Sequence, residues 1–336
     1  MRSLIKATGL VTEGNGSVAL RDLFRFVPTE FDLDPAGAKL VAEPVPADAS
    51  HDLGTLVLVH GNYWKDAIGQ KPSPSERMFL LEPTRDDPRF QEVLRRYRVY
   101  FYQYPTHLDV KVSAAALATQ LRAVLPAHAT GPDLVVIAHS LGGLVARHAL
   151  QDDDIAPRVR DVITLATPHH GTVLASVVMA DARIREKVGL FGLFCQRMSR
   201  RVWPITPGLK GMAYDNLDAL VPRQDVERYG IFVNSDLAEL NGRDRVAHKI
   251  SALMGRVKDC RWLEKRNLFD QVPRWIMGKL DPIYRGLDPL VHLESGLGYG
   301  LTVKKRFPLD RLDHETIATS PESRDIIFQI LLDPKG

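Results

Sequence analysis

Short runs of consecutive apolar residues recur along the first half of the chain. Two of them, 56–59 and 134–137, are rich in β-branched side chains, which is typical of strands that are covered on both faces of a parallel sheet. Between such runs, apolar residues return at helical spacing. In chain order we expect a strand over 54–59, a helix over 88–97, a strand over 98–102, a helix over 112–125, a strand over 134–137 and a strand over 160–166.

This alternation of strands and helices predicts the α/β fold class. A mostly parallel sheet flanked by helices is the arrangement that buries such strands and one face of each helix. For the helix over 112–125, the pattern puts Val112, Leu117, Leu121 and Val124 on the buried face.

The two ends of the chain and the stretch after residue 172 depart from this alternation. Prolines interrupt residues 1–53, where 18–26 and 39–45 are candidate edge strands. We predict one domain with a helical cap inserted at about 173–225 and a second, irregular insertion at about 237–285. The remaining expected elements are a strand over 228–234, a strand over 301–307 and a final helix from Pro321 to about Leu332 that Ser320 caps.

Composition narrows the class of protein. The 336 residues are 45% hydrophobic and 25% charged, with a formal net charge of +3 at pH 7. These values are ordinary for a globular chain and give no reason to expect nucleic-acid binding. We find neither the roughly 18 apolar residues of a membrane span nor a signal-peptide pattern. We therefore expect a cytoplasmic protein. Cys195 and Cys260 allow one pairing but no disulfide framework, and neither has a Cys or His at metal-ligand spacing, so we expect free thiols.

The segment Ala138-His139-Ser140-Leu141-Gly142 follows the apolar run at 134–137 directly. It fits a small-x-Ser-x-small pattern, in which a sharp strand-to-helix turn raises a nucleophilic serine above the edge of a sheet. Small residues are needed on both sides because side chains would collide in so tight a turn. The alternative is that the serine only caps the following helix.

Two further loops follow expected strands. His60-Gly61-Asn62 comes after the strand over 54–59, and ligands in α/β sheets bind at such carboxyl ends; the alternative is a plain strand-to-turn junction. Thr167 to Gly171 follows the strand over 160–166 and contains the pair His169 and His170. No third His, Cys or carboxylate residue lies near this pair at the spacing of metal ligands, so we expect no metal site there.

Serine chemistry also needs an imidazole that takes the hydroxyl proton and a carboxylate that orients the imidazole. In one common chain order the serine comes first, then the acid, then the histidine. Asp236 and Asp288 are the acid candidates. Of the late histidines His248, His292 and His314, only His314 lies in a loop between the last expected strand and the closing helix.

Together these segments resemble the α/β-hydrolase lipases and esterases, and more narrowly the bacterial triacylglycerol lipases and related lipase-like acyl hydrolases. The likeness covers about residues 54–320 and implies the α/β-hydrolase fold. Its segments are 59–62, 138–143, 167–171, 288–291 and 312–314.

The resemblance implies a role for five residues. Ser140 would be the nucleophile, His314 the general base and then acid, and Asp288 the orienting carboxylate. The backbone N–H groups of Asn62 and Leu141 would form the oxyanion hole. No cofactor is implied.

The sequence departs from the family pattern at two positions. Ala138 stands where glycine is commoner, which the turn tolerates. Pro289 replaces the glycine that usually follows the acid, and an Asp before Pro is often only a turn residue. Asp236 therefore remains the alternative acid, and Asp281 is a weaker one.

The cap segment carries apolar residues beside several arginines. We expect it to cover an apolar acyl pocket. One alternative is a lid that opens on lipid and contacts a membrane surface transiently; the other is a helix packed on the core with solvated arginines. The apolar residues are Val188, Leu190, Phe191, Leu193 and Phe194, and the arginines are Arg183, Arg185, Arg197, Arg200 and Arg201.

The expected activity is hydrolysis of carboxylic esters, with small-molecule or lipid acyl esters as substrates, through an acyl-enzyme on Ser140. One alternative keeps this triad but passes the acyl group to an alcohol, amine or thiol. The other is a non-catalytic binding protein with the same fold. The sequence gives no signal for an oligomeric state.

Overall fold

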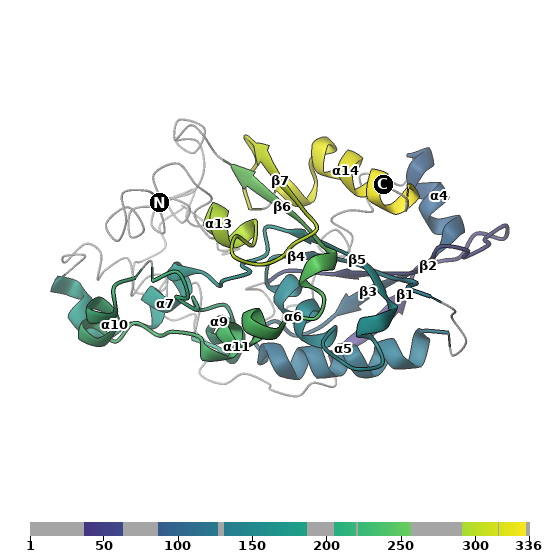
Figure 1. Ribbon diagram of the computed structural model, residues 1–336. Coiled ribbons are helices and arrows are strands. Elements are labelled where there is room, and N and C mark those ends of the chain that lie inside the picture. The colour runs from purple at the N-terminus through teal and green to yellow at the C-terminus, as the bar shows by residue number, and fades with distance from the viewer. Residues whose placement is uncertain are drawn as a thin grey trace, which may run out of the picture.

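A seven-stranded sheet forms the centre of the molecule (Figure 1). The structure is a computed structural model, and it describes residues 37–62, 87–126, 131–186, 205–219, 221–256, 291–314 and 316–333. The strands lie in the order β1-β3-β2-β4-β5-β6-β7. β1 is antiparallel to β3, and the other neighbouring pairs are parallel. Their bounds are β1 Lys39–Ala42, β2 Gly54–Val59, β3 Tyr97–Gln103, β4 Leu134–His139, β5 Val159–Leu165, β6 Ile250–Arg256 and β7 Lys305–Asp310.

Helices connect the parallel strands and lie on both faces of the sheet. The α-helices are α4 Pro88–Arg96, α5 Val110–Val124, α6 Leu141–Ala149, α7 Val173–Met179, α9 Pro207–Gly211, α10 Arg223–Tyr229, α11 Ser235–Arg243, α13 Leu293–Gly296 and α14 Pro321–Leu332. Short 3-10 helices are η4 Ala156–Arg158, η5 Ala182–Ile184, η6 Ala247–Lys249 and η9 Thr316–Ala318.

Two hydrophobic cores form, one on each face of the sheet. Because successive side chains of a strand point to opposite faces, Val57 and Val59 of β2 join the core under α5 and α6. Leu56 and Leu58 join the core under α4 and α14. In Figure 1, α5 and α6 lie below the sheet, and α4 and α14 lie above it. The continuous apolar runs in the sequence are therefore explained by burial on both sides.

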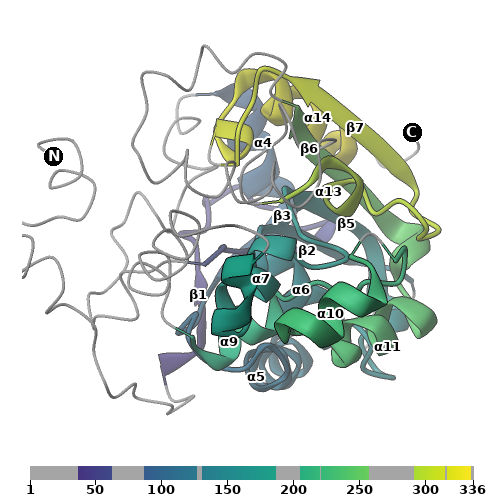
Figure 2. The same ribbon diagram turned by 90° about the vertical axis from the view of Figure 1, so that its left-hand side faces the viewer.

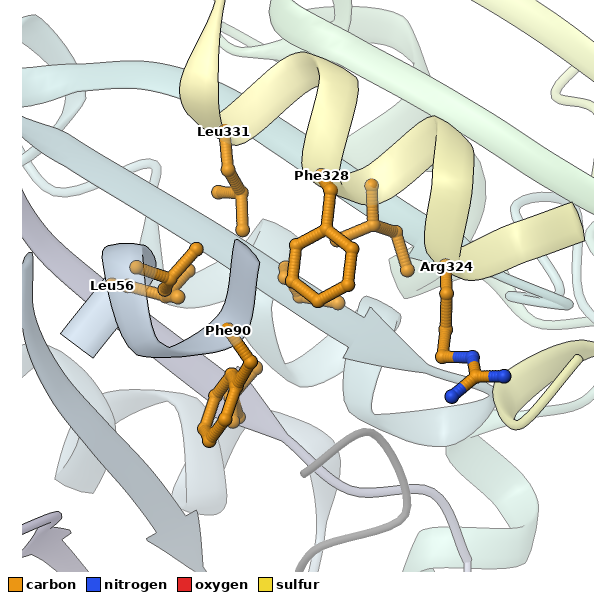
Figure 3. A pocket seen from close by; sticks show the side chains of 9 residues that line it. Leu56, Phe90, Arg324, Phe328 and Leu331 are labelled. Atoms are coloured by element: carbon orange, nitrogen blue, oxygen red, sulfur yellow. The ribbon is translucent and has the colours of Figure 1, made fainter. Parts of the chain in front are cut away.

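A small apolar cavity lies in the core beneath α4 and α14. Figure 3 shows Leu56, Phe90, Phe328 and Leu331 around it. Its volume is about 20 Å³, which is the space of about one water molecule. It is too small for an organic substrate, and its lining comes from the core between the helices and the sheet.

Several sequence predictions are confirmed. β2, β3, β4 and β5 and the helices α4, α5 and α14 lie where the pattern predicts them to within about two residues. β1 lies within the candidate edge strand at 39–45 and pairs on one side only. Ser320 caps α14, since its hydroxyl accepts a hydrogen bond from the Ser323 amide.

The strand predicted over 228–234 is wrong. Residues up to Tyr229 belong to α10, which ends at Gly230 in the left-handed conformation (φ 59°). The next helix, α11, begins directly after Asn234, whose side chain accepts a hydrogen bond from the Leu237 amide. The apolar residues between them form a short connection between two helices.

The strand that follows β5 in the sheet is β6, inside the segment expected to be irregular at about 237–285. Val162 of β5 pairs with Ile250, and β6 is buried along nearly its whole length. The described part of that segment, residues 237–256, therefore contains regular secondary structure, the end of α11 and the strand β6. The last strand is also shifted: β7 begins at Lys305, whereas the pattern predicted 301–307.

The predicted buried face of α5 needs one correction. Val112 is 42% exposed, whereas Val110, Ala114, Leu117 and Leu121 are buried. The buried positions follow helical spacing from Val110, so the stripe begins two residues earlier than predicted.

The connection from β5 to β6, residues 166–249, contains α7, α9, α10 and α11. Figures 1 and 2 show these helices grouped beside α5 and α6. α7 is almost completely buried. None of the described helices has both the length and the apolarity needed to cross a bilayer.

Several predictions concern residues outside the described part of the chain. These are the edge strand at 18–26, both cysteines, the apolar cluster at 188–194, Asp281 and Asp288.

Candidate active site

Four polar loops meet at one edge of the sheet. Asn62 lies just beyond the end of β2, Ser140 follows β4, His170 lies beyond β5, and His314 lies beyond β7. Because these strands are parallel, their carboxyl ends share this edge, which is where open α/β sheets hold ligands.

Ser140 adopts a strained backbone conformation at the junction of β4 and α6. Its φ is 51° and its ψ is −127°, in a region that costs a non-glycine residue about 1 to 3 kcal/mol. Its amide donates a hydrogen bond to the Leu165 carbonyl at 2.9 Å, which anchors the turn to β5. Its hydroxyl makes no capping hydrogen bond to α6, so the interpretation of Ser140 as a helix cap is wrong.

The Ser140 side chain faces His314 instead. The distance from Oγ to Nε2 is 2.8 Å, which is hydrogen-bonding distance. Only 6% of Ser140 is exposed. The two residues are 174 positions apart in the chain, so the fold brings together the serine and the histidine that the sequence selected.

Glycines allow the chain segments around Ser140 to approach one another. A Cβ on Gly142 would lie 2.2 Å from the His60 carbonyl oxygen, and a Cβ on Gly61 would lie 2.9 Å from Ser140 Cβ. A Cβ on Gly143 would lie 2.0 Å from Thr167 Oγ1. The loop after β2 is therefore in direct contact with the turn that holds the serine.

His60 orients the peptide between Gly61 and Asn62. The Tyr104 amide donates to His60 Nε2 at 3.3 Å, so the ring proton is on Nδ1, which donates to the Gly61 carbonyl at 2.8 Å. The His60 ring also stacks on Tyr104 at 4.4 Å between centroids. In a trans peptide the C=O and the following N–H point in opposite directions, so the Asn62 N–H is directed away from His60.

Leu141 is the first residue of α6, and it is buried. The first amides of a helix have no acceptor within the helix and carry the positive end of its dipole. The Leu141 amide directly follows Ser140 in the chain, which makes it a suitable donor to a negative charge that develops beside the serine.

His139 is a residue of the site that the sequence patterns did not select. Its Nε2 lies 2.8 Å from the His314 carbonyl oxygen. Burial, and then the charge of His314, lower the pKa of His139 to about 3. The ring is therefore neutral at ordinary pH. Its position beside the serine in the elbow motif was the available signal, but the contact with His314 depends on strands that are distant in sequence.

His170, in the loop after β5, forms an ion pair with Asp215, which lies after α9. Its Nδ1 lies 2.9 Å from Asp215 Oδ2, and its Nε2 lies 2.7 Å from the Tyr299 carbonyl oxygen. Burial disfavours the charged ring, but the hydrogen bond and charge of Asp215 outweigh it and raise the pKa of His170. The pair joins this loop to the segments around α9 and α13.

His169 points to different partners. Its Nε2 lies 3.0 Å from Thr164 Oγ1, and its Nδ1 lies 3.3 Å from Arg147 Nη1. Burial, followed by the charge of Arg147, lowers the pKa of His169 well below its usual range. The paired histidines thus contact different charged partners, and Asn241 links the two groups by donating to the His169 carbonyl and to Asp215 Oδ2. The described residues contain no group of three potential metal ligands.

Arg147 is a buried charge on α6, behind the elbow. Its Nε donates to Asp244 Oδ2 at 2.7 Å, and both side chains are at most 1% exposed. Its other nitrogens donate to Asn241 Oδ1 and to the His169 carbonyl. This network fastens α6 to α11 and to the loop after β5.

Of the two acid candidates, Asp236 and Asp288, only Asp236 lies in the described part of the chain. Asp236 lies in the first turn of α11, half exposed, with Oδ1 2.8 Å from Lys111 Nζ. The strand after which it was expected does not exist. Asp288 is outside the described residues.

Comparison with known proteins identifies the fold. A family model described as a domain of unknown function, DUF7379, matches residues 22–201. Curated proteins gave no match. Among solved structures, mature lipase BlEst2 of Bacillus licheniformis aligns with 89% of this chain and 99% of its own, at 16% identity and a TM-score of 0.54. Its propeptide form aligns with 89% of this chain and 54% of its own, at 16% identity and a TM-score of 0.52. The chain therefore has the α/β-hydrolase fold that the sequence predicted.

Proposed function

The chain belongs to the DUF7379 family, and we propose that it is a serine hydrolase that cleaves carboxylic esters through an acyl-enzyme on Ser140. The observation that carries the proposal is the 2.8 Å approach of Ser140 Oγ to His314 Nε2. It is made by a serine in a strained turn between a strand and a helix, which is the conformation of a nucleophile elbow.

In the first half of the reaction, the Ser140 hydroxyl gives its proton to His314 Nε2 as Oγ bonds to the acyl carbon. The carbonyl electrons move to oxygen and form an oxyanion. The tetrahedral intermediate then loses the alkoxy group, which leaves as an alcohol after it takes the proton from His314.

In the second half, water replaces the alcohol. His314 takes a proton from water as the hydroxide oxygen attacks the acyl carbon. The bond to Oγ breaks, Oγ recovers the proton from His314, and the carboxylic acid is released. No cofactor is needed for these steps.

We propose the amides of Asn62 and Leu141 as the oxyanion hole. The His60 hydrogen bond to the Gly61 carbonyl supports this role for Asn62, because it fixes the direction of the following N–H. The helix N-terminus supports it for Leu141. Preorganised donors of this kind contribute about 3 to 4 kcal/mol each to transition-state stabilisation.

Asp288 is our proposal for the carboxylate that orients His314, on the strength of the family resemblance and the chain order. Asp236 is the weaker candidate because it pairs with Lys111 at the surface. Asp288→Asn and Asp236→Asn variants separate the two, since only the true partner of His314 affects turnover strongly.

We further propose acyl esters, including lipid esters, as substrates, with residues 173–225 as the cap over the acyl chain. The lipase among the structural neighbours supports this class at the level of the fold. Turnover of p-nitrophenyl esters of increasing acyl length tests it. A sharp preference for the shortest chains contradicts the lipid assignment but leaves the ester hydrolase intact.

Replacing Ser140 by alanine tests the proposed function. We expect Ser140→Ala to lose p-nitrophenyl ester hydrolysis by a factor of about 10⁴ or more and to lose labelling by a fluorophosphonate probe. The thermal midpoint should not fall, because alanine removes only a hydroxyl. Unchanged turnover in this variant contradicts the proposal.

A further inference from the structure

The nucleophile and the base of the proposed site come from distant parts of the sheet. Ser140 follows β4, whereas His314 follows β7, and β5 and β6 lie between these strands. β7 lies at the end of the strand order and is only partly buried. A small displacement of the segment after β7 would change the 2.8 Å distance between Ser140 Oγ and His314 Nε2. A misplacement of about 1 Å can cost about 100-fold in rate.

His139 connects these two parts directly. Its side chain makes a hydrogen bond to the main chain of His314, with 2.8 Å from Nε2 to the carbonyl oxygen. A carbonyl oxygen only accepts, so Nε2 carries the proton and donates. The two imidazole rings are also in contact, with centroids 5.1 Å apart and planes inclined by 48°.

This contact closes a ring of interactions around the reacting atoms. His139 and Ser140 are consecutive residues, so one segment contacts His314 at two points. His139 contacts its backbone carbonyl, and Ser140 contacts its ring. Two contacts fix both the position of the His314 backbone and the orientation of its side chain, whereas the Ser140 contact alone fixes only the ring nitrogen.

The surroundings of His139 fit a donor that carries no charge. Burial and the neighbouring His314 lower its pKa to about 3, so it does not add a second positive charge beside His314 when His314 becomes protonated. On its other side Gly61 leaves room for the ring, since a Cβ there would lie 2.8 Å from His139 Nδ1.

We propose that His139 is a positioning residue. It holds the main chain of His314 where the His314 ring can form its hydrogen bond with Ser140. The inference rests on the proposed function, because it assigns His139 a part in the same site. His139 acts through its contacts with the main chain and ring of His314 and takes up no proton during turnover. Its loss should therefore lower kcat and leave KM nearly unchanged.

Substitutions at His139 that differ in their donors test the proposal. His139→Gln retains an N–H at about the reach of Nε2, His139→Asn retains an amide that is too short, and His139→Leu has no donor. We expect kcat to fall about 10- to 100-fold in the Leu and Asn variants, with KM within about twofold, and the Gln variant to recover most of the loss. Equal kcat in the Gln and Asn variants overturns the proposal.

His148→Leu is the matched control. His148 is another partly buried histidine, near the end of α6, and burial, with the charge of Arg147, lowers its pKa to about 4. We expect its replacement to leave kcat unchanged. Thermal midpoints of all variants separate a loss of folding from a loss of position. If every His139 variant fails to fold while the control folds, His139 is a structural residue and the proposal is overturned.

A double-mutant cycle with His314 asks whether His139 acts through that residue. In a His314→Ala background, His139→Leu should cause no further loss of the residual activity, because there is no ring left to position. Additive losses contradict the proposal. The pH at half-maximal kcat/KM should also be the same in His139→Gln as in the unmodified chain, and a shift of more than about one unit makes His139 a proton-transfer group.

The outcomes distinguish this inference from the proposed function. If the unmodified chain hydrolyses esters and Ser140→Ala does not, equal activity of all His139 variants overturns only the positioning role. If Ser140→Ala remains active, the proposed function itself fails.

Discussion

Gly142 stands where α6 meets the end of β2. A Cβ at this position would lie 2.2 Å from the His60 carbonyl oxygen and 2.7 Å from that of Val59. Both atoms belong to the backbone, so neither can swing aside. We expect Gly142→Ala to lower the free energy of unfolding by about 1 to 3 kcal/mol through overpacking. Ester turnover should fall too, because the added methyl separates the Ser140 turn from the loop that holds Asn62. Urea unfolding and kcat/KM measure the two effects.

Gly242 is the matched control for this substitution. It lies in α11 with no atom within 4 Å of an added Cβ. Alanine in a helix is favoured over glycine by about 0.5 to 1 kcal/mol, so Gly242→Ala should raise stability and leave turnover unchanged. If Gly142→Ala is as stable and as active as Gly242→Ala, α6 does not pack as closely against the end of β2 as described above.

At the scale of single residues, the sequence offers a signal where a short local pattern surrounds a residue. Ser140 and Gly142 belong to one five-residue motif, and His314 was selected by its order in the chain. The contact between His139 and His314 could not be predicted, because it depends on how β4, β5, β6 and β7 pair. The orientation of Asn62 likewise depends on Tyr104, which comes from the end of another strand.

α6 and α11 are joined by a buried ion pair. Arg147 of α6 donates to Asp244, and neither side chain is more than 1% exposed. We expect Arg147→Met to lower the free energy of unfolding by about 3 to 5 kcal/mol, because it leaves the Asp244 carboxylate buried without its positively charged partner. Urea unfolding at pH 7 measures the loss. Arg147→Met with Asp244→Asn should recover part of it, since the neutral amide is less costly to bury. An additive loss in the double variant contradicts this account.

At the level of elements, prediction succeeded where burial on both faces produced continuous apolar runs, as in β2 and β4. It failed for β6, whose sequence Ile-Ser-Ala-Leu-Met-Gly-Arg contains several good helix formers. Its position between β5 and β7 outweighs that local preference. The run at 231–233 looked like a strand, but Gly230 and Asn234 act as the end of α10 and the start of α11.

At the scale of the whole molecule, buried histidines should make stability depend on pH. Burial, with the charge of Arg147, lowers the pKa of His169 well below 6.5. Burial lowers the pKa of His292 to about 4. Between about pH 4 and 6.5 the unfolded chain therefore binds protons that the folded chain does not. Stability should fall as pH decreases through this range, by up to ~1.4 kcal/mol per pH unit for each such group.

His170 should act in the opposite direction. Burial disfavours its charge, but Asp215 raises its pKa, so its contribution is complete below pH 6.5 and is lost as pH rises through the raised value. Urea unfolding between pH 4.5 and 8 measures the loss of stability on the acid side and on the alkaline side. We expect His292→Phe to reduce the slope on the acid side by about one proton and to leave the alkaline side unchanged. His170→Gln should flatten only the alkaline side. If His292→Phe keeps the full acid slope, His292 is protonated in the folded chain and the burial of its ring does not control stability.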